Sequence, residues 1–233
     1  MAGELAALGA TVILVGRRQQ PLEEAAQELT QRGGSAYGVV GDVRDPERID
    51  EIAQQVMAEH GPIDVLVNSA AGNFRVAPED MSANAWNAVV RIVLDGSWHW
   101  TQAVGRQAIA NEREASILSI GTVGALRGGP QTAHSASAKA GVVAMTKSLA
   151  AAWGPHGIRL NVLTPGITDG TPGAEILFRD PGMREQAIGE VPLGRAAGLA
   201  EVAHAASFLL SKYAAYITGA NLLVDGGRSL GRS

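Results

Sequence analysis

Short runs of aliphatic and β-branched residues alternate along the chain with longer segments whose apolar residues recur every three to four positions. The short runs predict buried strands, and the longer segments predict amphipathic helices. The predicted strands are Thr11–Val15, Ala36–Val40, Ile63–Asn68, Ser116–Ile120, Arg159–Leu163 and Asn221–Val224. The predicted helices are Pro21–Gln31, Pro46–Glu59, Ala83–Ala110, Thr132–Trp153 and Leu199–Ser211. This alternation predicts an α/β fold, a doubly wound parallel sheet of the Rossmann type with helices on both faces.

Local signals support these boundaries. Asp45 before Pro46 is a helix N-cap signal, and Gly61-Pro62 is a stop signal. Residues 166–198 contain several Gly and Pro and predict a long loop with a short helix, of the kind that acts as a lid over a site. No linker or repeat divides the chain, so we expect residues 1–233 to form a single domain.

The beginning of the chain departs from the pattern of a dinucleotide-binding fold. Residues 2–8 read as the last turns of a helix that should follow a first strand and a glycine-rich pyrophosphate loop. Without that central strand, the two strands beside it have unpaired backbone N–H and C=O groups in the interior. Each unmade buried hydrogen bond costs about 1 to 3 kcal/mol, and the total stability of a folded domain is only about 5 to 15 kcal/mol. We therefore expect the first strand and the loop, about 15 to 25 residues, upstream of Met1. The alternative is a short form whose flanking strands pair directly.

Composition narrows the class of protein. Hydrophobic residues make up 46% and charged residues 18%, which is enough apolar material for a packed core. The net charge of −4 argues against nucleic-acid binding, and the absence of cysteine excludes disulfides and thiolate chemistry. No apolar stretch reaches the roughly 20 residues of a membrane span, no leader pattern is present, and no metal-ligand cluster is predicted, so we expect a soluble, cytoplasmic protein.

The turn after the first predicted strand carries the first candidate chemistry. Gly16-Arg17-Arg18 occupies the position where such folds read the adenosine ribose. A carboxylate there prefers the free 2′-hydroxyl of NADH, whereas a guanidinium prefers the 2′-phosphate of NADPH. Arg17 and Arg18 therefore favour NADPH, and the alternative is a solvated basic turn.

Further motifs follow in a fixed order. They are Gly41-Asp-Val-Arg44, Asn68-Ser-Ala-Ala-Gly-Asn-Phe74, Asp95-Gly96, Ser135-Ala-Ser-Ala-Lys139, Asn161-Val-Leu-Thr-Pro-Gly166 and Val224-Asp-Gly-Gly227. In this order and at these spacings they resemble the short-chain dehydrogenase/reductase family over essentially the whole chain. The resemblance implies cofactor contacts from Asp42, Val43, Asn68, Ala70, Lys139, Pro165, Gly166 and Thr168. Lys139 would hydrogen-bond the nicotinamide ribose and lower the pKa of a nearby proton donor.

The chain departs from that family where its general acid normally stands. The usual tyrosine, four residues before the lysine, is Ser135 here, while Thr122 replaces the usual serine and Asp95 the usual asparagine. The tyrosines present, at positions 37, 213 and 216, are expected to have packing roles. Serine is far less acidic than phenol, so simple carbonyl reduction loses its proton donor.

Serine at this position is typical of a subfamily that the chain resembles, the 2,4-dienoyl-CoA reductases of the short-chain type. The segments that carry this resemblance are 70–74, 92–96 and 135–141. The resemblance implies that the acyl thioester contacts Asn73, Phe74 and Ser82. It also implies that the CoA phosphates contact Arg44 and Arg179.

Reduction of a conjugated thioester needs only hydrogen bonds to an oxygen that carries developing enolate charge, and Asn73, Thr122 and Ser135 are candidates for donating them. The proton donor to carbon stays open among water, a protonated Asp95 and a residue of the 166–198 loop. Some subfamily members carry a tyrosine two residues after the threonine, which is Gly124 here. His134, beside Ser135, is either a participant in the site or a surface or interface histidine, and the second is favoured because adjacent helix residues point to different faces.

Three function hypotheses follow. The first is NADPH-dependent reduction of a 2,4-dienoyl-CoA or enoyl-CoA thioester in unsaturated fatty-acid breakdown. The alternatives are a carbonyl or alcohol oxidoreductase of the same family with an unusual proton donor, and a catalytically inactive structural paralogue. The resemblance also implies a homo-oligomer, with a tetramer as the expected form, and Trp86, Trp98 and Trp100 are expected to pack in the core or at a subunit interface.

Overall fold

The computed structural model describes residues 1–171 and 181–231. Its strands are β1 (Thr11–Gly16), β2 (Ser35–Val40), β3 (Val65–Asn68), β4 (Ala115–Ile120), β5 (Ile158–Pro165) and β6 (Asn221–Val224). All pairings between these strands are parallel, β1 with β2 and then β3, β4, β5 and β6 in that order. Each predicted strand is confirmed, with ends displaced by at most two residues.

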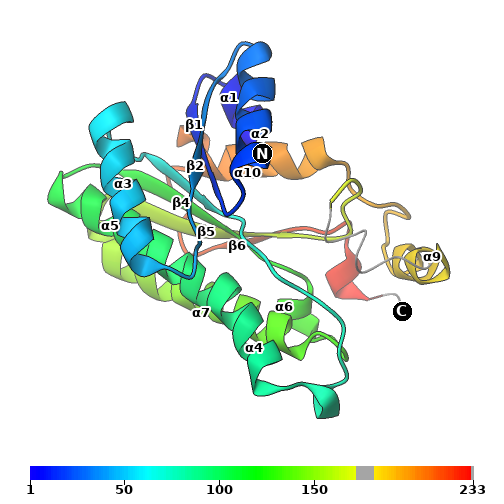
Figure 1. Ribbon diagram of the computed structural model, residues 1–233. Helices are drawn as coiled ribbons and strands as arrows, with labels where there is room; N and C mark the ends of the chain where they lie inside the picture. Colours follow the sequence, from blue (N-terminus) through cyan, green and yellow to red (C-terminus); the bar gives the residue numbers. More distant parts are fainter. Residues whose placement is uncertain (172–180, 232–233) are drawn as a thin grey trace.

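Helices cover both faces of this parallel structure (Figure 1). They are α1 (Ala2–Ala7), α2 (Gln19–Gln31), α3 (Pro46–His60), α4 (Ala83–Val90), α5 (Gly96–Ala110), α6 (Gly124–Arg127), α7 (Ala133–Trp153), α9 (Pro181–Gly189) and α10 (Leu199–Leu210). Helices α3, α5 and α7 pack together on one face, and α1 and α10 lie on the other. The Rossmann-type α/β fold class is therefore confirmed.

Strands β1 and β3 are not paired with each other. These two strands belong to different sheets, so the direct pairing that the short-form alternative requires is not formed. Ile13 and Val15 of β1 and Leu66 of β3 instead pack against the same buried core, in which Ile49 and Ile52 of α3 are at most 1% exposed.

The predicted helix 83–110 is interrupted in the structure. Between α4 and α5, residues Arg91–Asp95 form a π-helical turn. The apolar periodicity did not indicate this turn because the chain stays helical on both sides of it. A π turn admits one extra residue into the helical repeat and is often found at functional sites. Asp95 is the last residue of this turn, so the interruption falls on a predicted catalytic position.

Expectations about single side chains are partly wrong and partly confirmed. His134 is 0% exposed and not a surface residue, because the chain folds the Phe74 ring against it. Tyr213 and Tyr216 are 91% and 105% exposed, so neither has a packing role in this chain. Tyr37 is 47% exposed and lies against the ring of His60. Trp100 is buried in the core, whereas Trp86 and Trp98 are more than a third exposed.

The predicted loop 166–198 contains the expected short helix, α9. Arg179 and the segment around it lie outside the described residues. Asp45 caps α3 as predicted, since its side chain accepts a hydrogen bond from the backbone N–H of Arg48. None of the helices within the described ranges is long and apolar enough to cross a membrane.

Candidate active site

The carboxyl ends of β3, β4 and β5 bring candidate residues to one edge of the larger sheet. Asn68 ends β3, Thr122 follows β4, and Pro165 ends β5, and parallel strands place such positions side by side. The buried Asn68 side chain donates hydrogen bonds to Thr101 Oγ1 at 2.9 Å and Ser119 Oγ at 3.4 Å. Asn68 therefore fixes the end of β3 against α5 and β4, while Ala70, two residues further on, is exposed.

The end of β5 comes unusually close to the end of β6. A Cβ atom at Gly166 would lie 2.7 Å from the Cα of Asp225, so a side chain does not fit there. Thr168, two residues further on, is 8% exposed and makes an isolated bridge to Ala197. The predicted nicotinamide segment is therefore held between β6 and the residues that follow α9.

Helix α7 carries Ser135 and Lys139 one turn apart. They are 8% and 6% exposed, so both face into the molecule, as their spacing predicted. Lys139 Nζ donates a hydrogen bond to the backbone oxygen of Ile120, the last residue of β4, at 2.5 Å. Burial lowers the pKa of the Lys139 ammonium to about 8, because a low-dielectric environment disfavours the charged form.

The loop after β2 packs against the start of α5. A Cβ atom at Gly96 would lie 2.7 Å from Val43 Cγ2, so glycine at this position lets the two segments meet. This contact brings Asp42 and Val43, the predicted adenine-binding pair, next to the π turn that ends at Asp95. The loop therefore reaches the same region as the strand ends.

Arg44 is paired inside the chain. Its guanidinium donates to both carboxylate oxygens of Asp42, and its backbone N–H donates to Asp42 Oδ1 at 3.0 Å. The side-chain hydrogen bond from Arg44 lowers the pKa of Asp42 to about 2. Arg44, which was predicted to contact the CoA phosphates, therefore binds Asp42, which was predicted to contact the adenine. By contrast, Arg17 and Arg18 at the end of β1 are exposed, with no ion pair to a carboxylate in the described part of the chain.

The three predicted thioester contacts lie in two environments. Ser82 is the N-cap of α4, where its hydroxyl oxygen accepts a hydrogen bond from the N–H of Ala85 at 3.1 Å. The Phe74 ring meets the His134 ring edge to face, with centroids 4.5 Å apart. Asn73 and Phe74 therefore lie next to the start of α7, where His134 stands one residue before Ser135.

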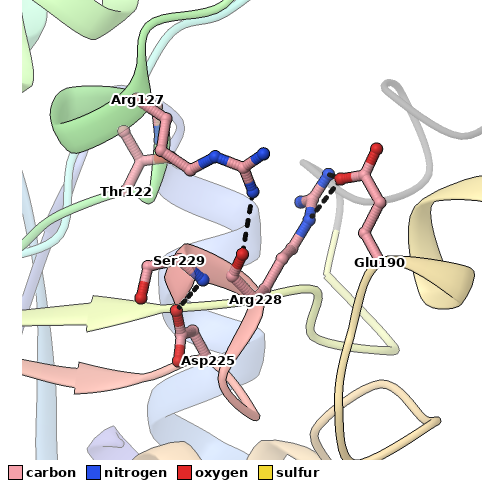
Figure 2. Close-up of polar contacts among 7 residues, drawn as sticks. Thr122, Arg127, Glu190, Asp225, Arg228 and Ser229 are labelled. Atoms are coloured by element: carbon pink, nitrogen blue, oxygen red, sulfur yellow. Dashed lines mark hydrogen bonds and ion pairs between the residues drawn. The ribbon is translucent and has the colours of Figure 1, made fainter. Parts of the chain in front are cut away.

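Polar contacts that sequence reasoning missed join α6, the residues after α9 and the residues after β6 (Figure 2). Arg127 of α6 donates to the backbone oxygen of Arg228 at 2.8 Å, and the Arg228 guanidinium pairs with Glu190 at 3.2 Å. Asp225 accepts hydrogen bonds from the N–H groups of Gly227 and Ser229. Burial alone raises the pKa of Asp225, but these hydrogen bonds outweigh it, and the net pKa is lowered. Only the Val224–Gly227 motif signalled this region in the sequence.

These residues fit a dinucleotide better than a metal ion. Glycines at 96 and 166 let the neighbouring segments pack closely around the strand ends, Lys139 places a buried ammonium there, and Arg17 and Arg18 are exposed after β1. Over the described ranges, no group of three or more His, Cys, Asp or Glu residues is placed to hold a metal ion.

Comparison with known proteins agrees with this geometry. The family model described as Enoyl-(Acyl carrier protein) reductase matches residues 1–229. A Bacillus subtilis protein named as a probable 2,4-dienoyl-CoA reductase is 38% identical over 231 residues, covering 99% of this chain and 91% of that relative. The peroxisomal 2,4-dienoyl-CoA reductase of Danio rerio is 34% identical over 220 residues, covering 94% of this chain and 73% of that relative.

Solved structures show the same class. A short chain dehydrogenase from Bacillus anthracis has a TM-score of 0.90 at 39% identity and covers 100% of this chain and 91% of its own. A gluconate 5-dehydrogenase from Burkholderia cenocepacia, solved with NADP and tartrate, has a TM-score of 0.93 at 29% identity, with coverage of 99% and 90%. The chain belongs to the short-chain dehydrogenase/reductase family. The predicted likeness to the 2,4-dienoyl-CoA reductases within it is confirmed by the names of its relatives.

Proposed function

We propose that this chain catalyses the NADPH-dependent reduction of a 2,4-dienoyl or enoyl CoA thioester. The observation that carries the proposal is the side chain one helical turn before Lys139. It is a buried serine, and the three tyrosines of the chain are at positions 37, 213 and 216, outside the strand-end site. A site of this family without a phenol suits transfer of hydride to carbon better than to a carbonyl.

In the proposed reaction the protein stabilises negative charge on the thioester oxygen. NADPH supplies a hydride for the distal carbon of the conjugated system. Ser135 and Thr122 donate hydrogen bonds to the thioester oxygen, together with the Asn73 side-chain amide. The Lys139 ammonium adds positive charge from within a buried site, where it is less screened than in water. The proton then reaches carbon from water, from Asp95 or from the 166–198 segment.

The preference for NADPH rests on charge. Arg17 and Arg18 are exposed and follow β1 directly. Neither forms an ion pair in the described part of the chain, although Arg17 acts on Asp42 through its charge, so both guanidinium groups can bind a 2′-phosphate. The Burkholderia cenocepacia structure, which contains NADP, supports this choice of cofactor. Asp42, Val43, Asn68, Ala70, Pro165, Gly166 and Thr168 are the remaining proposed cofactor contacts.

A homo-oligomer is proposed as the assembled form. Trp86 of α4 and Trp98 of α5 are 38% and 37% exposed, a large apolar surface for two neighbouring helices. Burial of these rings between subunits would remove that surface from water. Sedimentation at micromolar concentration tests this, and a monomer would contradict it.

The activity is tested by following the near-ultraviolet absorbance of NADPH with a 2,4-dienoyl-CoA and, separately, with simple ketones. The proposal expects turnover of the thioester and none of the ketones. Turnover of ketones without turnover of thioesters would favour a carbonyl oxidoreductase. No binding of NADPH at millimolar concentration would favour an inactive paralogue.

A further inference from the structure

Two buried polar atoms beside the predicted thioester site have no hydrogen-bond partner among the described residues. They are His134 Nε2 and Asn73 Oδ1. An unpaired buried polar atom costs about 1 to 3 kcal/mol, so such atoms are few in folded proteins and often mark a ligand site. The proposed mechanism uses neither atom.

The hydrogen bond from the next residue shows which nitrogen of the His134 ring carries the proton. The backbone N–H of Ser135 donates a hydrogen bond to His134 Nδ1 at 2.8 Å, so Nδ1 is an acceptor. In a neutral imidazole the proton then resides on Nε2. His134 therefore offers one buried N–H donor, and Asn73 offers one buried oxygen acceptor.

Backbone and ring contacts bring the segments that carry the two atoms together. The N–H of Val76 donates to the backbone oxygen of Gln131 at 3.0 Å, which places residues 73–76 alongside residues 131–134. The Phe74 ring, next to Asn73 in the chain, lies against the His134 ring. This corner adjoins Ser135, the proposed hydrogen-bond donor to the thioester oxygen.

One donor and one acceptor complement an amide, which presents one N–H and one C=O. A thioester or an ester presents acceptors only. In an acyl-CoA the amide nearest to the reacting group belongs to the cysteamine unit, two methylene groups from the thioester sulfur. Asn73 has two functional ends, so its NH₂ can donate to the thioester oxygen while its Oδ1 accepts from that amide.

We propose that Asn73 and His134 bind the cysteamine amide of the substrate, Asn73 Oδ1 accepting from its N–H and His134 Nε2 donating to its C=O. This inference rests on the proposed function. It requires the Phe74 ring to turn aside as the thioester enters, because both atoms are covered in the structure. Phe74 is 36% exposed and belongs to no helix or strand, so its ring is only partly buried and its backbone is outside the regular elements.

The test compares three dienoyl thioesters in the NADPH assay. The N-acetylcysteamine thioester has both amide groups, the thioester of 2-mercaptoethyl acetate keeps the C=O and lacks the N–H, and an S-butyl thioester lacks both. Asn73→Leu should lower kcat/KM for the first substrate about tenfold more than for the other two. His134→Phe should lower it about tenfold more for the first two than for the S-butyl thioester.

Ratios between substrates are unaffected by a partly unfolded variant, because loss of folded enzyme lowers all three rates equally. His134→Gln keeps an N–H donor and should restore part of the discrimination, whereas His156→Phe, at an exposed histidine on 3₁₀ turn 154–156, should leave the ratios unchanged. Unchanged ratios in both Asn73→Leu and His134→Phe would overturn the inference alone. A wild-type chain that reduces none of the thioesters would instead overturn the proposed function beneath it.

Discussion

The Lys139 ammonium on α7 donates a hydrogen bond to the backbone oxygen of Ile120, which ends β4. This contact ties the helix that carries Ser135 to the strand that leads to Thr122. It also keeps a charged group at a position that is only 6% exposed. Burial of the Lys139 ammonium therefore lowers the stability of the folded chain, but it holds a positive charge beside Ser135 and the end of β4.

That cost predicts a pH dependence of stability. The pKa of Lys139 is lowered by burial from 10.5 to about 8 in the folded chain. Between those pH values the unfolded chain binds more protons, so the free energy of unfolding of the wild type should rise with pH relative to Lys139→Met. The penalty is full below about pH 8 and gone above about pH 10.5, and it amounts to about 3 kcal/mol.

Urea unfolding of both proteins at several pH values measures this difference. Lys147→Met, on the exposed face of the same helix, is the matched control and should follow the wild type at every pH. Parallel stability curves for the wild type and Lys139→Met would show that Lys139 carries no such penalty.

Ser135→Ala should lower kcat for the dienoyl thioester about 100-fold, the usual effect of removing one donor to a developing oxyanion. Ser148→Ala makes the same chemical change on the exposed face of α7, where the hydroxyl donates a hydrogen bond to the Ala144 backbone oxygen, and should leave kcat within about twofold. Steady-state kinetics with NADPH at saturation distinguish the two. Equal kcat for Ser135→Ala and the wild type would exclude Ser135 from the mechanism.

Replacement of Arg17 and Arg18 by alanine should raise KM for NADPH at least tenfold and leave KM for NADH nearly unchanged, because only NADPH carries the 2′-phosphate. Arg32→Ala removes one exposed positive charge at the end of α2 and should alter neither KM. An equal rise in KM for NADPH and NADH would mean that the two arginines do not bind the 2′-phosphate.

Gly96→Ala should destabilise the chain by about 1 to 3 kcal/mol and weaken NADPH binding. The added Cβ would lie 2.7 Å from Val43 Cγ2 and 3.1 Å from the Val43 oxygen, so the loop with Asp42 must move. Gly154→Ala is the control, since Gly154 has helical φ and nothing lies within 4 Å of its added Cβ. It should stabilise by about 0.4 to 1 kcal/mol. Thermal unfolding and NADPH titration of both variants check the pair.

Local patterns predicted most of the fold. The strands, the Asp45 cap and the one-turn spacing of Ser135 and Lys139 follow from neighbours in sequence, and the structure has them. Contacts between distant segments could not be predicted in this way. The burial of His134 depends on Phe74, sixty residues away, and the Arg127–Arg228 hydrogen bond joins residues separated by 101 positions.

The π turn at Arg91–Asp95 and the Asp42–Arg44 pair were missed for a different reason. Helical periodicity tolerates one inserted residue, so the apolar pattern gave no sign of the π turn. Asp42 and Arg44 were each assigned to a ligand by family resemblance, and that assignment does not consider how two neighbouring charges satisfy each other.

The site of hydride transfer tests the central claim most directly. The chain is incubated with a 2,4-dienoyl-CoA and NADPH that carries deuterium at the transferred position, and the product is analysed by mass spectrometry and NMR. We predict one deuterium on the distal carbon of the former conjugated system, with the thioester intact. Deuterium on a carbinol or aldehyde carbon, formed by reduction of a carbonyl, would contradict the proposed function.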